Sequence, residues 1–174
     1  MGGAVVNLIG AALIMLGCTV AGIIKARSLS ETDKTYGALI SALSLMKSEI
    51  SSRAAPLDEV LRIVGNTANG EVGRFVLTVS SDFSKLGEES FYDIWSKAVQ
   101  SSLQSVSQRS LSAVKTIGSS LGRYDSAMQC EMLDRCINEL SVEQNALRKT
   151  LCANKRMYIG IGGSVGLIIA IVLI

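Results

Sequence analysis

Residues 1–24 read MGGAVVNLIGAALIMLGCTVAGII and contain no aspartate, glutamate, lysine or arginine. The last stretch, residues 157–174, reads MYIGIGGSVGLIIAIVLI and is equally free of charge. A bilayer core takes about 20 helical residues to cross, and backbone that faces lipid must form its hydrogen bonds within its own helix. The sequence therefore predicts transmembrane helices at residues 2–24 and 157–174, with a domain of residues 25–156 between them.

The residues that flank the two apolar stretches predict the orientation of the chain in the membrane. Basic residues close to a span stay on the cytoplasmic side. The basic residues after the first stretch and before the second are Lys25, Arg27, Lys34, Arg148, Lys149, Lys155 and Arg156. We therefore expect the domain in the cytoplasm and both chain ends outside. A cleaved signal peptide is the main alternative for the first stretch, but it requires basic residues before the apolar run, and none is present.

The central domain is predicted to be all-α, a cytoplasmic helical bundle. Its apolar residues recur at steps of three and four, which is typical of helices with one buried face. The predicted helices cover about 30–54, 56–64, 71–86, 90 into the low hundreds, 111–121, and 125 onward. The residues predicted to be buried in the first five are Tyr36, Leu39, Leu43, Met46, Ile50, Leu57, Val60, Leu61, Val64, Val72, Phe75, Val76, Val79, Phe83, Phe91, Ile94, Trp95, Ala98, Leu103, Leu111, Val114, Ile117 and Leu121.

Capping and breaking residues predict several of the helix ends. Ser30 with Asp33 is similar to a capping box at the start of the first domain helix. Pro56 opens the second helix, since proline is tolerated in a first turn. Gly122 is expected to be a C-terminal glycine cap. The serine- and glutamine-rich stretch 101–112 fits either a loop or a poorly buried helix end.

The last predicted helix carries a heptad seam. Its seam residues, at steps of three and four, are Cys130, Leu133, Ile137, Leu140, Gln144, Leu147 and Leu151. Gln144 is the one polar interruption. No breaker occurs before Gly160, so one helix is predicted to run from the domain into the second apolar stretch.

Little in the sequence points to catalysis. The chain has no histidine, which excludes histidine-based triads and histidine metal sites. It has no phosphate-binding glycine loop of the G-x-x-x-x-G-K-[ST] type, and its net charge of +2 is too small to indicate a nucleic-acid surface. The cysteines, which form no C-x-x-C pair, are predicted to be small buried hydrophobes rather than metal ligands; they are Cys18, Cys130, Cys136 and Cys152. We predict no enzyme activity, no cofactor and no nucleic-acid partner.

Small residues recur within the predicted spans. Gly162 and Gly166 are four apart in the second span, and Gly17 and Ala21 are four apart in the first. Small residues at this spacing let two membrane helices approach closely. We predict that these four residues form helix-packing faces, which are also compatible with a homo-oligomer.

Residues 121–129, which read LGRYDSAMQ, resemble the L-G-x-[ST]-D-x-x-x-Q signature of the stage III sporulation protein AB family. The resemblance extends to Ala55-Pro56-Leu57, to the aromatic helix start at 91–95, and to the basic-flanked, glycine-containing end of the chain. One departure is Tyr124, where the family usually has serine or threonine. Asp125 would then have to cap the long helix alone.

The resemblance implies a non-catalytic platform in endospore formation. The family acts in the mother-cell membrane that faces the forespore, as part of a channel apparatus between the two cells. It is similar to the inner-membrane platform proteins of the type II secretion F and type IV pilus systems. The implied partners are the sporulation ATPase, stage III sporulation protein AA, and other proteins of the apparatus. The residues of the signature, Leu121, Gly122, Asp125 and Gln129, then form either a plain cap and turn or a partner contact.

Two other functions remain open at this point. The chain could be a self-assembling small membrane pore, similar to a holin, whose spans associate through their small residues. It could also be a membrane-anchored signalling module, in which the seam of the last helix passes on a conformational change.

Overall fold

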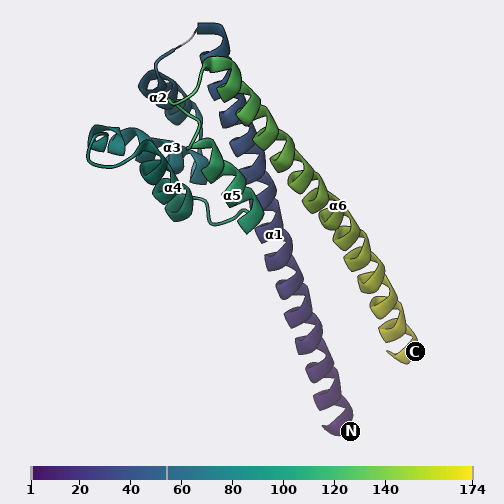
Figure 1. The fold of residues 1–174 in the computed structure, drawn as a ribbon. Coiled ribbons are helices and arrows are strands. Elements are labelled where there is room, and N and C mark those ends of the chain that lie inside the picture. Colours follow the sequence, from purple (N-terminus) through teal and green to yellow (C-terminus); the bar gives the residue numbers. More distant parts are fainter. Residues whose placement is uncertain (1, 54, 174) are drawn as a thin grey trace. The chain divides into compact units, whose positions relative to one another are not determined.

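The computed structural model describes the backbone of residues 2–53 and 55–173 and the side chains of residues 27–53 and 55–152. Within these ranges every regular element is helical (Figure 1), which confirms the all-α prediction. The elements in chain order are α1 (Gly2–Arg53), α2 (Leu57–Thr67), α3 (Gly70–Asp82), the 3₁₀ helix η1 (Phe83–Lys85), α4 (Phe91–Ser102), α5 (Gln108–Ile117) and α6 (Ser126–Leu173).

The chain divides into two units. One is Thr32–Ala146, and the other combines Met1–Glu31 with Leu147–Ile174. Both predicted membrane spans, 2–24 and 157–174, lie outside the residues whose side chains the structure describes. Among the residues that could be searched, no helix is both long and apolar enough to cross a bilayer.

α1 and α6 are each one uninterrupted helix. The prediction of a single helix from the domain to the C-terminal stretch is therefore confirmed for α6. The predicted helix start near Ser30 is wrong, because α1 passes through this position without a break. No proline occurs before Pro56, so nothing forces the helix to end earlier, and a serine inside a helix does not act as a cap.

In the Thr32–Ala146 unit, α1 and α6 run antiparallel and are joined by long-range polar contacts. The Lys47 ammonium lies 2.7 Å from both carboxylate oxygens of Asp134. Near the other end of the pair, Gln144 Nε2 donates to the backbone carbonyl of Asp33 at 3.0 Å. The polar residue that interrupts the heptad seam is thus buried and hydrogen-bonded, which is what a buried amide requires.

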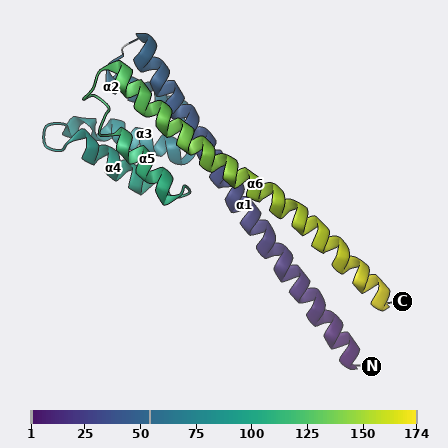
Figure 2. The ribbon, with the colours of Figure 1, turned by 45° about the vertical axis from the view of Figure 1, so that its right-hand side comes forward.

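α2, α3, α4 and α5 lie on one side of the paired parts of α1 and α6 in both views (Figure 1, Figure 2). α2 packs on α3, α3 on α4, and α4 on α5. Most residues that the sequence predicted to be buried are buried, while Leu57, Phe83 and Phe91 are half-buried.

Trp95 is the centre of this smaller helical group. Its side chain is fully buried, and its ring meets Phe75 edge-to-face with 4.7 Å between ring centroids. The indole Nε1 donates to the carbonyl of Val114 at 2.7 Å. One side chain therefore joins α3, α4 and α5, and its only polar group is satisfied, as a buried indole requires.

α5 ends at Ile117, earlier than the predicted end at Leu121. The chain then continues in turns, in which Ser120 N donates to Ile117 O and Arg123 N donates to Ser120 O. Gly122 does have the left-handed conformation expected of a glycine cap, with φ +73°, but it follows these turns rather than the helix itself.

The sequence allowed either a loop or a helix end in the stretch 101–112, and the structure contains both. α4 ends at Ser102, a loop follows, and α5 begins at Gln108. The loop is well fixed, because the Glu71 carboxylate accepts hydrogen bonds from the backbone N–H groups of Gln104 and Ser105.

We predict that Gly118→Ala destabilises the fold by about 1–3 kcal/mol, the usual cost of overpacking a core. A Cβ at this position would lie 2.4 Å from Trp95 Cδ1, closer than carbon atoms pack. Denaturant unfolding of the full chain in detergent, followed by circular dichroism, measures the change. Ser119→Ala, an exposed neighbour, is the control and should change stability by no more than about 0.5 kcal/mol. Equal stability of the Gly118→Ala variant and the parent would contradict the packing argument.

Candidate functional site

The segment Leu121–Gln129, which connects the turns after α5 to the start of α6, forms a fixed corner. Leu121 is buried beneath it. Gln129 makes two bonds: its backbone N–H donates to Asp125 O at 3.1 Å, and its side-chain Nε2 donates to Tyr124 O at 2.6 Å. The side chain of Gln129 thus closes the turn that leads into α6.

Asp125 has a different environment from the other signature residues. It is exposed, and its carboxylate makes no hydrogen bond or ion pair with the residues that the structure describes. Its backbone carbonyl accepts a hydrogen bond from Gln129 N in the first turn of α6, but its side chain does not cap the helix. A carboxylate at a helix N-terminus is electrostatically favourable, and this one remains accessible to a partner.

A depression of about 170 Å³ lies at the same corner. Its lining residues are Ile50, Ala55, Leu57, Gly122, Ser126 and Gln129. Of the four signature residues, the structure thus brings Gly122 and Gln129 together there, while Leu121 lies in the core and Asp125 is exposed nearby in the chain.

The other three lining residues are Ile50, Ala55 and Leu57, and sequence reasoning did not predict that they meet this corner. Their approach to Gly122 is a long-range contact, and no local pattern predicts it. Leu57 lies close to Gly122, because a Cβ placed on Gly122 would be 3.6 Å from Leu57 Cδ2. Two exposed apolar side chains, Tyr124 and Met128, belong to the same corner segment.

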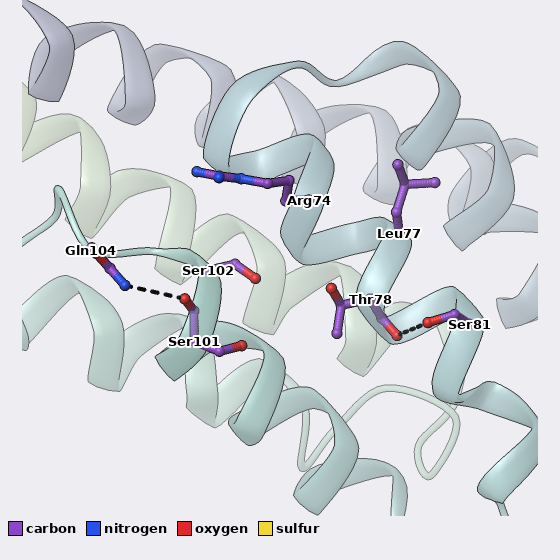
Figure 3. A pocket seen from close by; sticks show the side chains of 7 residues that line it. All are labelled: Arg74, Leu77, Thr78, Ser81, Ser101, Ser102 and Gln104. Atoms are coloured by element: carbon purple, nitrogen blue, oxygen red, sulfur yellow. Dashed lines mark hydrogen bonds between the residues drawn. The ribbon is translucent and has the colours of Figure 1, made fainter.

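A second, wider depression of about 620 Å³ lies between α3 and the end of α4 (Figure 3). Its lining residues are Arg74, Leu77, Thr78, Ser81, Ser101, Ser102 and Gln104. Arg74 is its one charged lining residue, and the guanidinium forms no ion pair with any residue in the described ranges. Such a surface offers a cation, hydroxyl groups and one apolar side chain.

The cysteines lie in different environments. Cys136 is buried as predicted, Cys130 is half-buried, and Cys152 is exposed, so the prediction of burial is wrong for Cys152. Cys152 belongs to the other unit, which combines Met1–Glu31 with Leu147–Ile174. Cys18 lies outside the residues whose side chains are described. In the part of the chain that was searched, no group of ligating side chains could hold a metal ion.

The predicted packing faces of the spans also lie outside the described side chains. They consist of Gly17, Ala21, Gly162 and Gly166, and they stay a prediction.

Comparison with known proteins identifies the family. A family model described as stage III sporulation protein AB matches residues 7–174, nearly the whole chain. The chain belongs to the stage III sporulation protein AB family. The resemblance noted at residues 121–129 is thereby confirmed, and the chain has a role in sporulation.

A solved structure of a stage III sporulation protein AB has a similar fold. It is 18% identical in sequence with a TM-score of 0.60, and the match covers 68% of this chain and 94% of that chain. At this identity the likeness concerns the fold alone. No curated protein matches the chain.

We predict that the cysteines of this family member react with a maleimide in a fixed order at about pH 8, because the thiolate is the reacting form. Exposed Cys152 should react first and Cys136 should be protected, since burial raises the pKa of the Cys136 thiol to about 12. Peptide mass spectrometry of the full chain measures the modification, and all cysteines should react after denaturation. Rapid labelling of Cys136 in the folded chain would contradict its burial.

The same pKa shift gives a pH dependence of stability. The unfolded chain exposes a thiol whose pKa is near 9.0, and therefore loses this proton before the folded chain does. The protonated Cys136 thiol thus makes its full contribution to the free energy of unfolding below about pH 9, and this contribution is lost as the pH rises toward about 12.

Proposed function

We propose that the chain is a non-catalytic membrane platform of the channel apparatus between mother cell and forespore. In this proposal its helical domain couples a cytoplasmic ATPase to assembly in the membrane. The observation that carries the proposal is that α1 and α6 are both uninterrupted helices. Each contains one half of an antiparallel helix pair in the Thr32–Ala146 unit and one of the two charge-free terminal stretches.

The membrane part of the proposal is supported by the sequence. The two stretches, 2–24 and 157–174, have the length and the lack of charge that membrane helices need. The basic residues at their inner ends favour a cytoplasmic domain. The family supports the mother-cell membrane that faces the forespore as its location. The small residues Gly17, Ala21, Gly162 and Gly166 would allow the spans to pack closely with each other or with other membrane proteins.

The platform part of the proposal is supported by analogy and by the surfaces of the domain. Platform proteins of the type II secretion F and type IV pilus systems use a small helical domain to meet an ATPase. In this chain the two depressions contain a single ionisable side chain, Arg74, among their lining residues. Such surfaces favour protein contacts over acid–base chemistry, which requires a positioned proton donor or acceptor.

The partner contact is proposed at the corner of Leu121, Gly122, Asp125 and Gln129. Three of these residues hold the turn. Leu121 is buried, Gly122 has a left-handed backbone, and the Gln129 side chain donates to Tyr124 O. Asp125 is then free to make a charged contact with stage III sporulation protein AA or another protein of the apparatus. The corner also presents the exposed apolar side chains of Tyr124 and Met128, which suit a protein interface.

The proposed topology predicts that both chain ends lie outside the cytoplasm. Alkaline phosphatase fused after Ile174 should be active, because the enzyme folds only after export, and a green fluorescent protein at the same position should be dark. The control is a phosphatase fusion that follows Asn69, inside the domain, which should be inactive. An inactive phosphatase after Ile174, in a stable fusion protein, would contradict the second span.

The proposed contact predicts that Asp125→Ala weakens partner binding without unfolding the domain. A tagged full-length chain is recovered in mild detergent from sporulating cells, and bound proteins are quantified by mass spectrometry. We expect the sporulation ATPase and other apparatus proteins with the parent chain, and about tenfold less of the direct partner with Asp125→Ala, as for loss of one good charged contact.

The matched control is Glu131→Ala, which removes an exposed carboxylate on α6 that lies outside the corner segment Leu121–Gln129. Its only ion pair among the described residues is with Arg135 one turn later, and such an exposed pair adds little stability. This variant should leave recovery unchanged. Circular dichroism of both variants separates a lost contact from a lost helix. Recovery of the bait alone with the parent chain, in cells that contain the ATPase, would contradict the platform proposal.

A further inference from the structure

Two exposed side chains of α3, Leu77 and Arg74, line the α3–α4 depression. The Leu77 side chain is 50% exposed although it lies on a helix of the core. It is supported from below by α2, where a Cβ on Gly65 would come within 3.1 Å of Leu77 Cδ2. One turn earlier on the same helix, Arg74 has no ion pair among the residues that the structure describes. A cation beside an apolar side chain is complementary to an anion beside an apolar side chain.

The segment Phe83–Ser90, which we name the tip, presents the complementary pair. The sequence predicted a helix up to Leu86, but α3 ends at Asp82, and η1 and a tight turn follow. In that turn Gly87 has φ +111°, and the N–H groups of Glu88 and Glu89 both donate to Lys85 O. This geometry leaves Leu86 40% exposed.

The tip contains two carboxylates, Glu88 and Glu89, and one lysine, Lys85, and Asp82 immediately precedes it. Asp82 pairs with Lys85, and Glu89 pairs with Lys97, each at 2.8 Å. Glu88 is exposed and forms no ion pair with any described residue. The tip therefore offers one apolar side chain, Leu86, beside one unpaired carboxylate.

The tip is also held in place before any contact is made. The ring of Phe83 lies 6.2 Å from that of Phe91, and Phe91 lies 5.8 Å from buried Trp95, measured between ring centroids. The tip thus has a rigid base in the core. A preformed contact surface loses less ordering entropy on binding than a flexible loop does.

We propose that the tip of one copy of this chain docks into the α3–α4 depression of a second copy. Leu86 then lies on Leu77, and Glu88 pairs with Arg74. Among the described residues Arg74 forms no ion pair with the tip of its own chain, and Asp82, which precedes the tip, lies about 12 Å further along α3 at 1.5 Å per residue.

The two surfaces are different patches of one chain, so the contact is heterologous. Each copy that receives a tip still has a tip to offer, and repetition of the contact forms a ring or a row of copies. An ion pair at its edge would contribute mainly to orientation and specificity, while the leucine contact removes apolar surface from water. The inference does not depend on the ATPase contact, which was proposed at a different corner.

The test is a photo-crosslink in the full-length chain. The variant Leu86→p-benzoylphenylalanine is purified and reconstituted into lipid vesicles with no other protein, then irradiated. We expect a band of twice the chain mass, with the crosslinked peptides mapping to α3 or the end of α4. Arg74→Glu, added to this chain, should reduce the band by about fivefold, the change expected when an exposed ion pair becomes a like-charge contact.

Charge reversal on both sides makes the test specific. The chain with both Arg74→Glu and Glu88→Arg restores opposite charges and should recover the band. Arg62→Glu, which reverses an exposed arginine on α2 outside the depression, is the control and should leave the band unchanged.

Three results would overturn the proposal: no band of twice the mass, a band that maps elsewhere, or a band that Arg74→Glu and Arg62→Glu reduce equally. The same photo-reactive variant, expressed in sporulating cells, tests the alternative that the depression binds an acidic segment of a different protein. A crosslink to such a protein, and none between copies, would also overturn it. Because the vesicles contain no ATPase, a negative result there leaves the platform proposal standing.

Discussion

The hydrogen bond from Gln144 to the Asp33 carbonyl fixes the register of α1 against α6, and the rest of the Thr32–Ala146 unit depends on that register. Gly37 lies beside the buried amide, and a Cβ there would be 3.4 Å from Gln144 Nε2, an ordinary packing distance. A shift that takes Gln144 off this carbonyl also separates Lys47 from Asp134, and an amide left buried without a partner costs about 1–3 kcal/mol. A wholly apolar seam would not penalise such a shift in this way.

The fixed pair in turn positions α5. Tyr36 on α1 shares a buried hydrogen bond of 2.9 Å with Ser110 on α5, and its hydroxyl accepts one from Ser107 N. On the side of α6, Arg109 pairs with Glu139 at 2.8 Å. These bonds join one short helix to both long ones. They form together only when the two long helices are in the observed register.

The sequence predicted what depends on local periodicity and missed what depends on distant contacts. A 3.6-residue period identified nearly all the buried faces, from Tyr36 on α1 to Leu140 on α6. It also identified Gln144 as an exception, but not its partner, which lies 111 residues away in sequence. The candidate corner shows the same division. Gly122 was found from its turn chemistry, whereas Leu57 comes close to it only because α2 packs there. The tip was missed because residues 83–86 continue an apolar helical pattern.

The packing around Trp95 explains how a short exposed tip can serve a larger assembly. From the tip, aromatic contacts lead through Phe91 to Trp95, whose indole bonds to the carbonyl of Val114 on α5. α5 is bonded to α1 through Ser110 and Tyr36. Close-packed interiors resist deformation, so a force on the tip displaces these helices as one body instead of bending a loop. A contact at the tip would therefore orient the whole Thr32–Ala146 unit, as the proposed contact between copies requires.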